Sequence, residues 1–306
     1  MNLVEAIPQK KLRGTRASTH IDMIRGMAAV AVLYSHARVL LMESVTSETR
    51  VTFKILYLLS GYGHSAVMVF FVLSGYLVGG GVVQSTATHR WCWGDYLLAR
   101  GTRLYLVLVP ALILTVVWDR VGIETVVARL ANDDTARAII TMEQVVANSS
   151  TISFLGNLAF LQTIAVPPYG SNAPLWSLAN EMWYYLIFPC LWLITRTGQT
   201  MTRRAVYSIL ALAMLAFVGF NIVSLFPVWL LGVGVALLPR IQWLESRWAF
   251  QVAGSPLIVT LGLIGLGRIP HGYIAQYAVA VTYTLFLVAL LQRREASQPS
   301  WYTRTA

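Results

Sequence analysis

The chain has 306 residues, of which 57% are hydrophobic and 12% charged, and its mean hydropathy is +0.62. These values exclude an ordinary soluble domain, in which about a quarter of the residues are charged. The two cysteines, Cys92 and Cys190, are too few for a disulfide framework and lack the paired spacing of a zinc site, so no metal is expected. The net charge of +10 is compatible with nucleic-acid binding or with membrane orientation, and the distribution of basic residues separates the two.

Apolar segments of bilayer-spanning length recur along the chain. They predict an all-α fold, a polytopic transmembrane helix bundle with about eight spans and a range of seven to nine. The expected spans are 21–42, 64–83, 96–118, 177–195, 205–222, 224–239, 252–267 and 272–291. Segment 151–166 is apolar but short, and it contains Asn157 and Gln162. This segment is therefore expected to be interfacial or re-entrant.

The basic residues indicate the orientation of the bundle. Most of the 23 lysines and arginines fall in segments that share one side of the membrane if the N-terminus is cytoplasmic, as the positive-inside rule requires. This topology gives a basic cytoplasmic tail (1–20), a transmembrane domain (21–292) and a cytoplasmic tail or truncated linker (293–306). The positive charge is then a topology signal, and no nucleic-acid partner is expected.

The first span contains three ionisable residues, and burying such residues in a bilayer costs free energy. Asp22, Arg25 and His36 share roughly one face of this helix. Together they could grip the two ends of a long ligand, and histidine is the most common general base. The structural alternative is that Arg25 extends to the inner interface beside Asp22 while His36 is a packing residue.

The second span carries small residues at helical spacing. Gly75 and Gly79 form a small-xxx-small pair, which indicates close helix packing. Ser74 could be a nucleophile, but a lone serine in a helix more often bonds to a backbone carbonyl of the preceding turn. The sequence therefore favours a packing role for this segment.

Charged residues also mark the third and fourth expected spans. Arg100 and Arg103 lie one turn apart at the cytoplasmic end and could clamp a phosphate, although basic residues at this level also anchor helices. The fourth expected span begins near Pro174, and Glu181 is its one carboxylate. Ser177 and Tyr185 lie four residues before and after Glu181, on the same face of the helix. A salt bridge from Glu181 to a neighbouring arginine is the structural alternative.

Four segments together resemble one family. They are RGMAAVAVLYSHA, FFVLSGYL, ARGTRLY and PLWSLANEMWYYLIFP, in this order. The chain is similar in them to the acyltransferase family 3 membrane proteins, bacterial enzymes that O-acylate surface or exported polysaccharides. The resemblance implies a multi-pass enzyme of the cytoplasmic (inner) membrane that transfers an acyl group, commonly acetyl, from acyl-coenzyme A to a sugar hydroxyl.

The resemblance also assigns roles to individual residues. It implies that His36 is the catalytic histidine and Glu181 the acid of the fourth motif, and it matches Arg25 to the arginine that precedes the histidine and Arg100 and Arg103 to the R-x-x-R motif. Because acyl-coenzyme A is polyanionic at one end, Arg100 and Arg103, together with Arg25, are expected to bind its phosphates. The resemblance matches Ser74 and Gly75 to the serine and glycine of the second motif, and it places Trp176 beside Ser177 in the fourth. Asn180 stands where a valine is common. The family's C-terminal serine-tyrosine and histidine motif has no match in the chain.

These residues lead to a mechanism and to alternatives. His36 is expected to take the proton from the acceptor hydroxyl or to carry the acyl group briefly itself, and Glu181 to orient the imidazole or stabilise its charge. No permanently bound cofactor is expected. The expected partners are acyl-coenzyme A, a glycan or lipid-linked sugar, membrane lipids and a protein that supplies the acceptor or missing spans. A truncated or partner-dependent remnant and a secondary transporter are the alternative functions.

Overall fold

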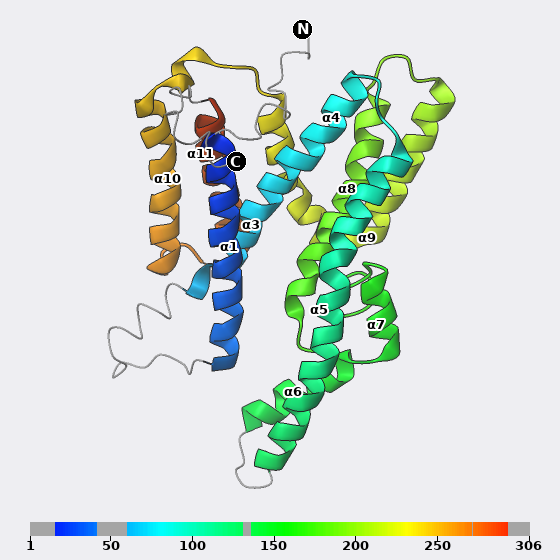
Figure 1. Ribbon diagram of the computed structural model, residues 1–306, viewed down its shortest axis with the longest axis vertical. Coiled ribbons are helices and arrows are strands. Elements are labelled where there is room, and N and C mark those ends of the chain that lie inside the picture. Colours follow the sequence, from blue (N-terminus) through cyan, green and yellow to red (C-terminus); the bar gives the residue numbers. More distant parts are fainter. Residues whose placement is uncertain (1–15, 42–59, 131–135, 271, 293–306) are drawn as a thin grey trace, which may run out of the picture. The chain divides into compact units, whose positions relative to one another are not determined.

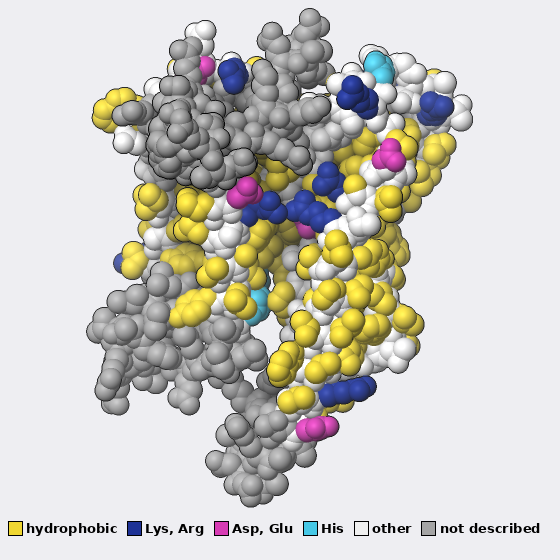
Figure 2. Space-filling model, viewed as in Figure 1, with side chains coloured by type: hydrophobic (Ala, Val, Ile, Leu, Met, Phe, Trp, Pro, Cys, Tyr) yellow, Lys and Arg dark blue, Asp and Glu magenta, His cyan; other side chains and the backbone are white. Residues whose placement is uncertain are grey.

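The computed structural model describes residues 16–41, 60–130, 136–270 and 272–292, and within these ranges the chain is helical and has no β-strand (Figure 1). Five helical segments are long and apolar enough to cross a membrane: Gly63–Ala87, Trp93–Glu124, Met201–Leu237, Trp248–Gly265 and Tyr273–Gln292. Exposed hydrophobic side chains cover much of the segment Trp93–Glu124 (Figure 2). The prediction of an all-α membrane protein is confirmed. Most of the predicted tails, residues 1–15 and 293–306, lies outside the described residues.

The remaining predicted spans also fall on helices. Helix α1 (Arg16–Leu41) contains the described part of the predicted span 21–42, and α8 (Trp176–Ile194) contains all but the last residue of 177–195. The predicted spans 205–222 and 224–239 lie along α9 (Met201–Leu237), which consists of two helices joined at a kink and ends two residues before the second span does. The break in this element lies at Gly219, whose φ of 73° and ψ of 177° only glycine adopts readily. The structure thus has two helices here, as predicted, but they meet at Gly219 and not between residues 222 and 224.

The chain divides into two compact units, which are described separately. The first comprises residues up to Thr88 together with those from Pro227 onward, and the second comprises His89–Phe226. In the first unit, α3 (Gly63–Ser74) packs against α1 and α11 (Tyr273–Gln292), and α11 packs against α10 (Arg247–Gly265). Helix α3 continues through the π-helical turn η4 (Gly75–Gly79) into α4 (Gly80–Ala87).

Two glycines allow this continuous helix to cross the last part of α9 at backbone contact. A β-carbon at Gly75 would collide with the carbonyl oxygen of Trp229, and a β-carbon at Gly232 would collide with that of Val72. Close approach of this kind is characteristic of small residues at membrane helix interfaces. The motif glycine Gly75 therefore has a packing role in the structure.

The second unit contains α5 (Trp93–Leu130), α6 (Ala136–Asn148), α7 (Thr151–Leu158), α8 and the first part of α9. Segment 151–166, predicted to be interfacial or re-entrant, forms α7 and a non-helical turn. Asn157, fully buried, donates to the carbonyls of Ser153 and Pro167 and accepts from the Tyr169 amide. Side-chain amides thus satisfy part of the backbone that the turn leaves without helical partners.

A second connection fixes the loop that leads to α8. The Asp119 carboxylate of α5 accepts hydrogen bonds from the backbone amide (2.9 Å) and hydroxyl (2.5 Å) of Ser171. Gln162, which is fully buried, donates to the carbonyl of Leu175 in the turn η5 (Ala173–Leu175) that precedes α8. These bonds fix the start of the helix that carries Glu181.

Candidate active site

The residues predicted to form the site divide between the two units. Asp22, Arg25, His36, Ser74 and Gly75 belong to the first unit. The others belong to the second unit: Arg100, Arg103, Trp176, Ser177, Glu181 and Tyr185.

Arg25 and Asp22 form an ion pair on α1. Their nearest side-chain atoms, Nη1 and Oδ1, are 3.5 Å apart, and the side chains are 38% and 68% exposed. A pair this exposed contributes little to stability, about 0–1 kcal/mol. The pairing is the one that the structural interpretation of Arg25 anticipated, and it leaves the guanidinium partly accessible.

His36 is half-buried near the start of α3. The neighbouring Ser35 lies where a β-carbon of Gly63 would be, so α1 and α3 touch at this point. His64 follows Gly63 and interacts electrostatically with His36. The predicted catalytic histidine therefore lies at a helix contact that brings a second imidazole near it.

Ser74 accepts a hydrogen bond from the indole Nε1–H of Trp229, at 3.2 Å. Ser74 is 9% exposed and Trp229 fully buried. The bond is made at the same crossing that Gly75 and Gly232 allow. The geometry assigns this motif serine to the connection between α3 and α9, in line with the packing role that the sequence favoured.

Replacing Ser74 should therefore affect stability more than turnover. Ser74→Ala removes the acceptor of a buried N–H, and we expect it to lower the free energy of unfolding by about 1–3 kcal/mol. Acyl transfer per folded molecule should stay unchanged. Thermal unfolding in detergent and transfer assays on the same preparation measure both effects. If the Ser74→Ala protein folds but transfers no acyl group, Ser74 acts as a nucleophile and the packing role alone is wrong.

In the second unit, a hydrogen-bonded connection joins α5 to the Glu181 motif. The Tyr96 hydroxyl donates to the carbonyl of Tyr185 at 3.0 Å, and the Tyr185 hydroxyl donates to Glu181 Oε1 at 2.8 Å. The guanidinium carbon of Arg100 lies 6.0 Å from the centre of the Tyr96 ring. Among the described residues of this unit, Glu181 has no basic side chain at ion-pair distance, so the expected salt-bridge alternative is not seen there.

The other residues of the two motifs have different surroundings. Arg103 is exposed, whereas Arg100 is largely covered. Ser177 donates to the carbonyl of Pro174 at 3.0 Å and so closes the first turn of α8, and Trp176 is half-buried beside it. Ser177 thus serves the local helix start and Tyr185 holds the carboxylate.

Several buried donors at one end of this unit have no acceptor among the described residues. They are Arg100 Nε, Trp91 Nε1 and Arg204 Nε. Trp91 and Trp93 pack against Tyr96 at the beginning of α5, and the Trp93 indole donates to Tyr207 of α9. Unpaired buried donors of this kind suit an anionic ligand. Trp91, Tyr96 and Arg204 were not predicted as site residues, although the aromatic residues that precede Arg100 are a signal in the sequence.

The described residues contain no cluster of three His, Cys, Asp or Glu side chains that could hold a metal ion. The three unpaired donors named above are one indole and two guanidinium N–H groups, which do not bind metal ions. The sequence profile of the acyltransferase 3 family, described as an acyltransferase domain, matches residues 19–302. The chain belongs to this family. No curated protein and no solved structure matches this acyltransferase in the corresponding comparisons.

Family membership and the apolar helices together establish the general class. The protein is a multi-pass membrane acyltransferase. Its family match spans all the residues predicted to form the site, from Asp22 to Tyr185. The two groups of polar residues are therefore the candidate machinery for acyl transfer.

Proposed function

We propose that this acyltransferase takes an acetyl group from acetyl-coenzyme A at the inner face of a bacterial cytoplasmic membrane. The acceptor is a hydroxyl of a cell-envelope or exported glycan. Acyl-coenzyme A has a polyanionic end and a thioester joined by a long arm, so its site needs buried cationic donors and a separate reactive group. Arg100, Arg103 and Arg25 provide the cations, and His36 provides the reactive group.

The observation that carries this proposal is the environment of Arg100. Its guanidinium is held beside Tyr96, and its buried Nε has no acceptor among the described residues of the unit. A residue that only anchors a helix would extend its guanidinium into water, where every donor is hydrated. A phosphate would supply the missing acceptor, and Arg103 on the next turn supplies a second, more accessible cation.

The transfer chemistry requires a base and a leaving group. In the direct route, the His36 imidazole takes the proton of the acceptor hydroxyl as its oxygen attacks the thioester carbonyl carbon. The new C–O bond forms, the C–S bond breaks, and the proton passes to the coenzyme A thiolate. In the alternative route, an imidazole nitrogen of His36 attacks the thioester carbonyl carbon, the C–S bond breaks, and coenzyme A leaves as the thiol with the imidazole proton. The acceptor hydroxyl then attacks the acyl-imidazole, the C–N bond breaks, and the hydroxyl proton returns to the imidazole.

Transfer of labelled acetyl from acetyl-coenzyme A into membrane-associated glycan tests the function. Membranes that contain the protein should incorporate label, and longer acyl donors in parallel assays determine the acyl preference. Membranes without the protein give the background. If the inserted protein incorporates no more label than this background while a related enzyme labels the same membranes, the proposal is wrong.

The phosphate role makes a separate binding prediction. We expect the double variant Arg100→Gln, Arg103→Gln to bind coenzyme A at least about tenfold more weakly, because charge-assisted hydrogen bonds are lost. Arg120→Gln is the matched control, since Arg120 is an exposed arginine of the same helix. Calorimetric titration of the purified proteins with coenzyme A measures this. Equal affinity of the double variant and the control would contradict the clamp.

Glu181 makes another prediction. Glu181→Gln keeps the shape of the side chain but removes its charge, and we expect kcat to fall at least about tenfold with little change in KM for the donor. Tyr185→Phe removes one hydrogen bond to the carboxylate and should have a smaller effect of the same kind. Steady-state kinetics, normalised to the amount of folded protein found by thermal unfolding of the same preparation, distinguish these results from a loss of folding. Wild-type turnover in Glu181→Gln would exclude it from the machinery.

A further inference from the structure

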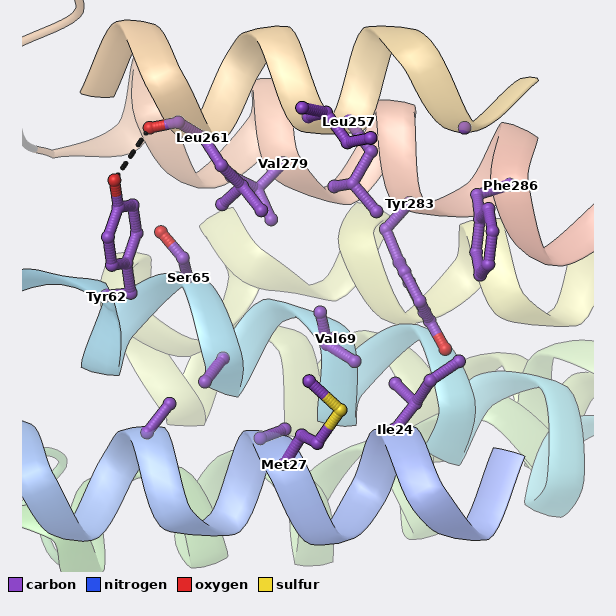
Figure 3. A pocket seen from close by; sticks show the side chains of 15 residues that line it. Ile24, Met27, Tyr62, Ser65, Val69, Leu257, Leu261, Val279, Tyr283 and Phe286 are labelled. Carbon is purple, nitrogen blue, oxygen red and sulfur yellow. Dashed lines mark hydrogen bonds between the residues drawn. The ribbon is translucent and has the colours of Figure 1, made fainter. Parts of the chain in front are cut away.

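The first unit contains a cavity of about 580 Å³ that none of the predicted site residues lines. Its walls come from α1, α3, α10 and α11 (Figure 3). Ile24, Met27 and Ala31 line it on α1, Val69 on α3, and Leu257 and Leu261 on α10. The cavity is large enough for an organic ligand of ordinary size.

The lining is apolar almost throughout. The hydroxyl of Tyr62 is already occupied, because it donates to the carbonyl of Leu261 at 2.9 Å (Figure 3). An apolar cavity of this kind does not hold water well, because water needs several polar partners. Three of the four surrounding helices are candidate membrane spans, and the apolar window of α10 is almost entirely exposed. The medium around this cavity is therefore hydrocarbon.

One polar group in the wall has no partner. Tyr283 of α11 is 1% exposed, and its hydroxyl has no hydrogen-bond partner among the described residues. The side chain extends across the cavity from α11 toward Ile24 of α1 (Figure 3). A buried hydroxyl without a partner is costly, so this position calls for a hydrogen-bond acceptor attached to an apolar body.

We propose that this cavity binds a fatty acyl chain of a membrane glycerophospholipid, with its ester carbonyl accepting a hydrogen bond from Tyr283. The chain fills the apolar space, and the ester supplies the acceptor that the protein lacks. The apolar lining thus suits the hydrocarbon chain, and the Tyr283 hydroxyl suits the ester carbonyl. The site is separate from the proposed acyl-coenzyme A chemistry and does not depend on it.

Photolabelling tests where the lipid chain lies. The full-length protein is placed in vesicles of phosphatidylethanolamine and phosphatidylglycerol that contain a phosphatidylcholine with a diazirine in one chain. Labelled peptides are then mapped. Labelling of residues 24–31 and 254–261 should exceed that of the exposed apolar face of α5, which reports ordinary contact with the bilayer.

A matched pair of variants distinguishes the cavity from the lipid-facing surface. Ala31→Phe fills the cavity and should lower its labelling relative to α5 at least about fivefold. Ala29→Phe adds the same ring at an exposed position of the same helix that does not line the cavity, and it should have no such effect. Unchanged labelling in a folded Ala31→Phe protein, or cross-linking of these residues to a second copy in place of lipid, would overturn the proposal.

The hydrogen bond is tested by changing the lipid and the tyrosine together. Tyr283→Phe is nearly isosteric, and we expect it to weaken cavity labelling by the ester lipid about fivefold, as the loss of one buried hydrogen bond implies. An ether-linked lipid has no ester carbonyl, so wild type and variant should be labelled alike. An equal loss with ester and ether lipids would overturn the assignment of the ester to Tyr283.

Discussion

Replacing His36 by alanine should reduce acetyl transfer by roughly 10²–10⁴-fold, because general-base catalysis by a positioned side chain contributes about this much. The side chain is half-buried on α1, and its removal deletes few core contacts. The protein should therefore remain in the membrane and keep its thermal stability. Incorporation of labelled acetyl per folded molecule measures the effect.

His20→Ala is the matched control for this experiment. His20 is an exposed histidine on the same helix, so its loss tests the general effect of removing an imidazole from α1. It should transfer acetyl at the wild-type rate. If His36→Ala retains turnover, both the general-base and the acyl-carrier routes are wrong.

Replacing Gly232 by alanine should strongly destabilise the first unit. The added β-carbon would collide with the carbonyl oxygen of Val72, and backbone on both sides leaves it no room to move. We expect a loss of about 3 kcal/mol, the upper end for overpacking in a core, and a marked fall in the apparent melting temperature. Thermal unfolding of the detergent-solubilised protein measures this.

Gly234→Ala provides the contrast two residues further along α9. Gly234 is exposed, and a β-carbon there has no atom within 4 Å. Alanine favours helix over glycine by about 1 kcal/mol, so this variant should be as stable as the wild type or more so. Equal melting temperatures for the two variants would show that the crossing of α3 and α9 does not limit stability.

The membrane helices could be predicted from the sequence because bilayer thickness fixes the length of an apolar segment. The break in α9 could not be placed, because Gly219 shows no local signal that separates it from the other glycines of the apolar helices. Hydropathy therefore predicted a span boundary at Val223, between the spans 205–222 and 224–239. The π-helical turn at Gly75–Gly79 was also hidden, since its extra residue per turn depends on packing against α9.

The charged residues of the candidate site could be predicted from the sequence, but the contacts that hold them could not. Charged residues within apolar segments, such as Arg100 and Glu181, are visible because the bilayer penalises them. Their supporting contacts are not visible, because Tyr96 bonds to the carbonyl of Tyr185, a residue 89 positions later on another helix. The same holds for Asn157 and Gln162. Both were conspicuous as amides in an apolar segment, but their partners in the following loop follow from the fold.

The buried polar contact between α8 and α9 has a direction, so its two side chains do not depend on each other equally. Asn180 donates to the Tyr184 hydroxyl at 3.1 Å, and Tyr184 donates to the carbonyl of Ile222 at 2.8 Å. Tyr184 keeps its acceptor whether or not position 180 is an amide, so a valine there is compatible with it. Asn180, however, is 2% exposed and needs the tyrosine hydroxyl. Losing the Tyr184 hydroxyl therefore removes the acceptor of a buried amide, whereas replacing Asn180 leaves the bond from Tyr184 to Ile222 in place.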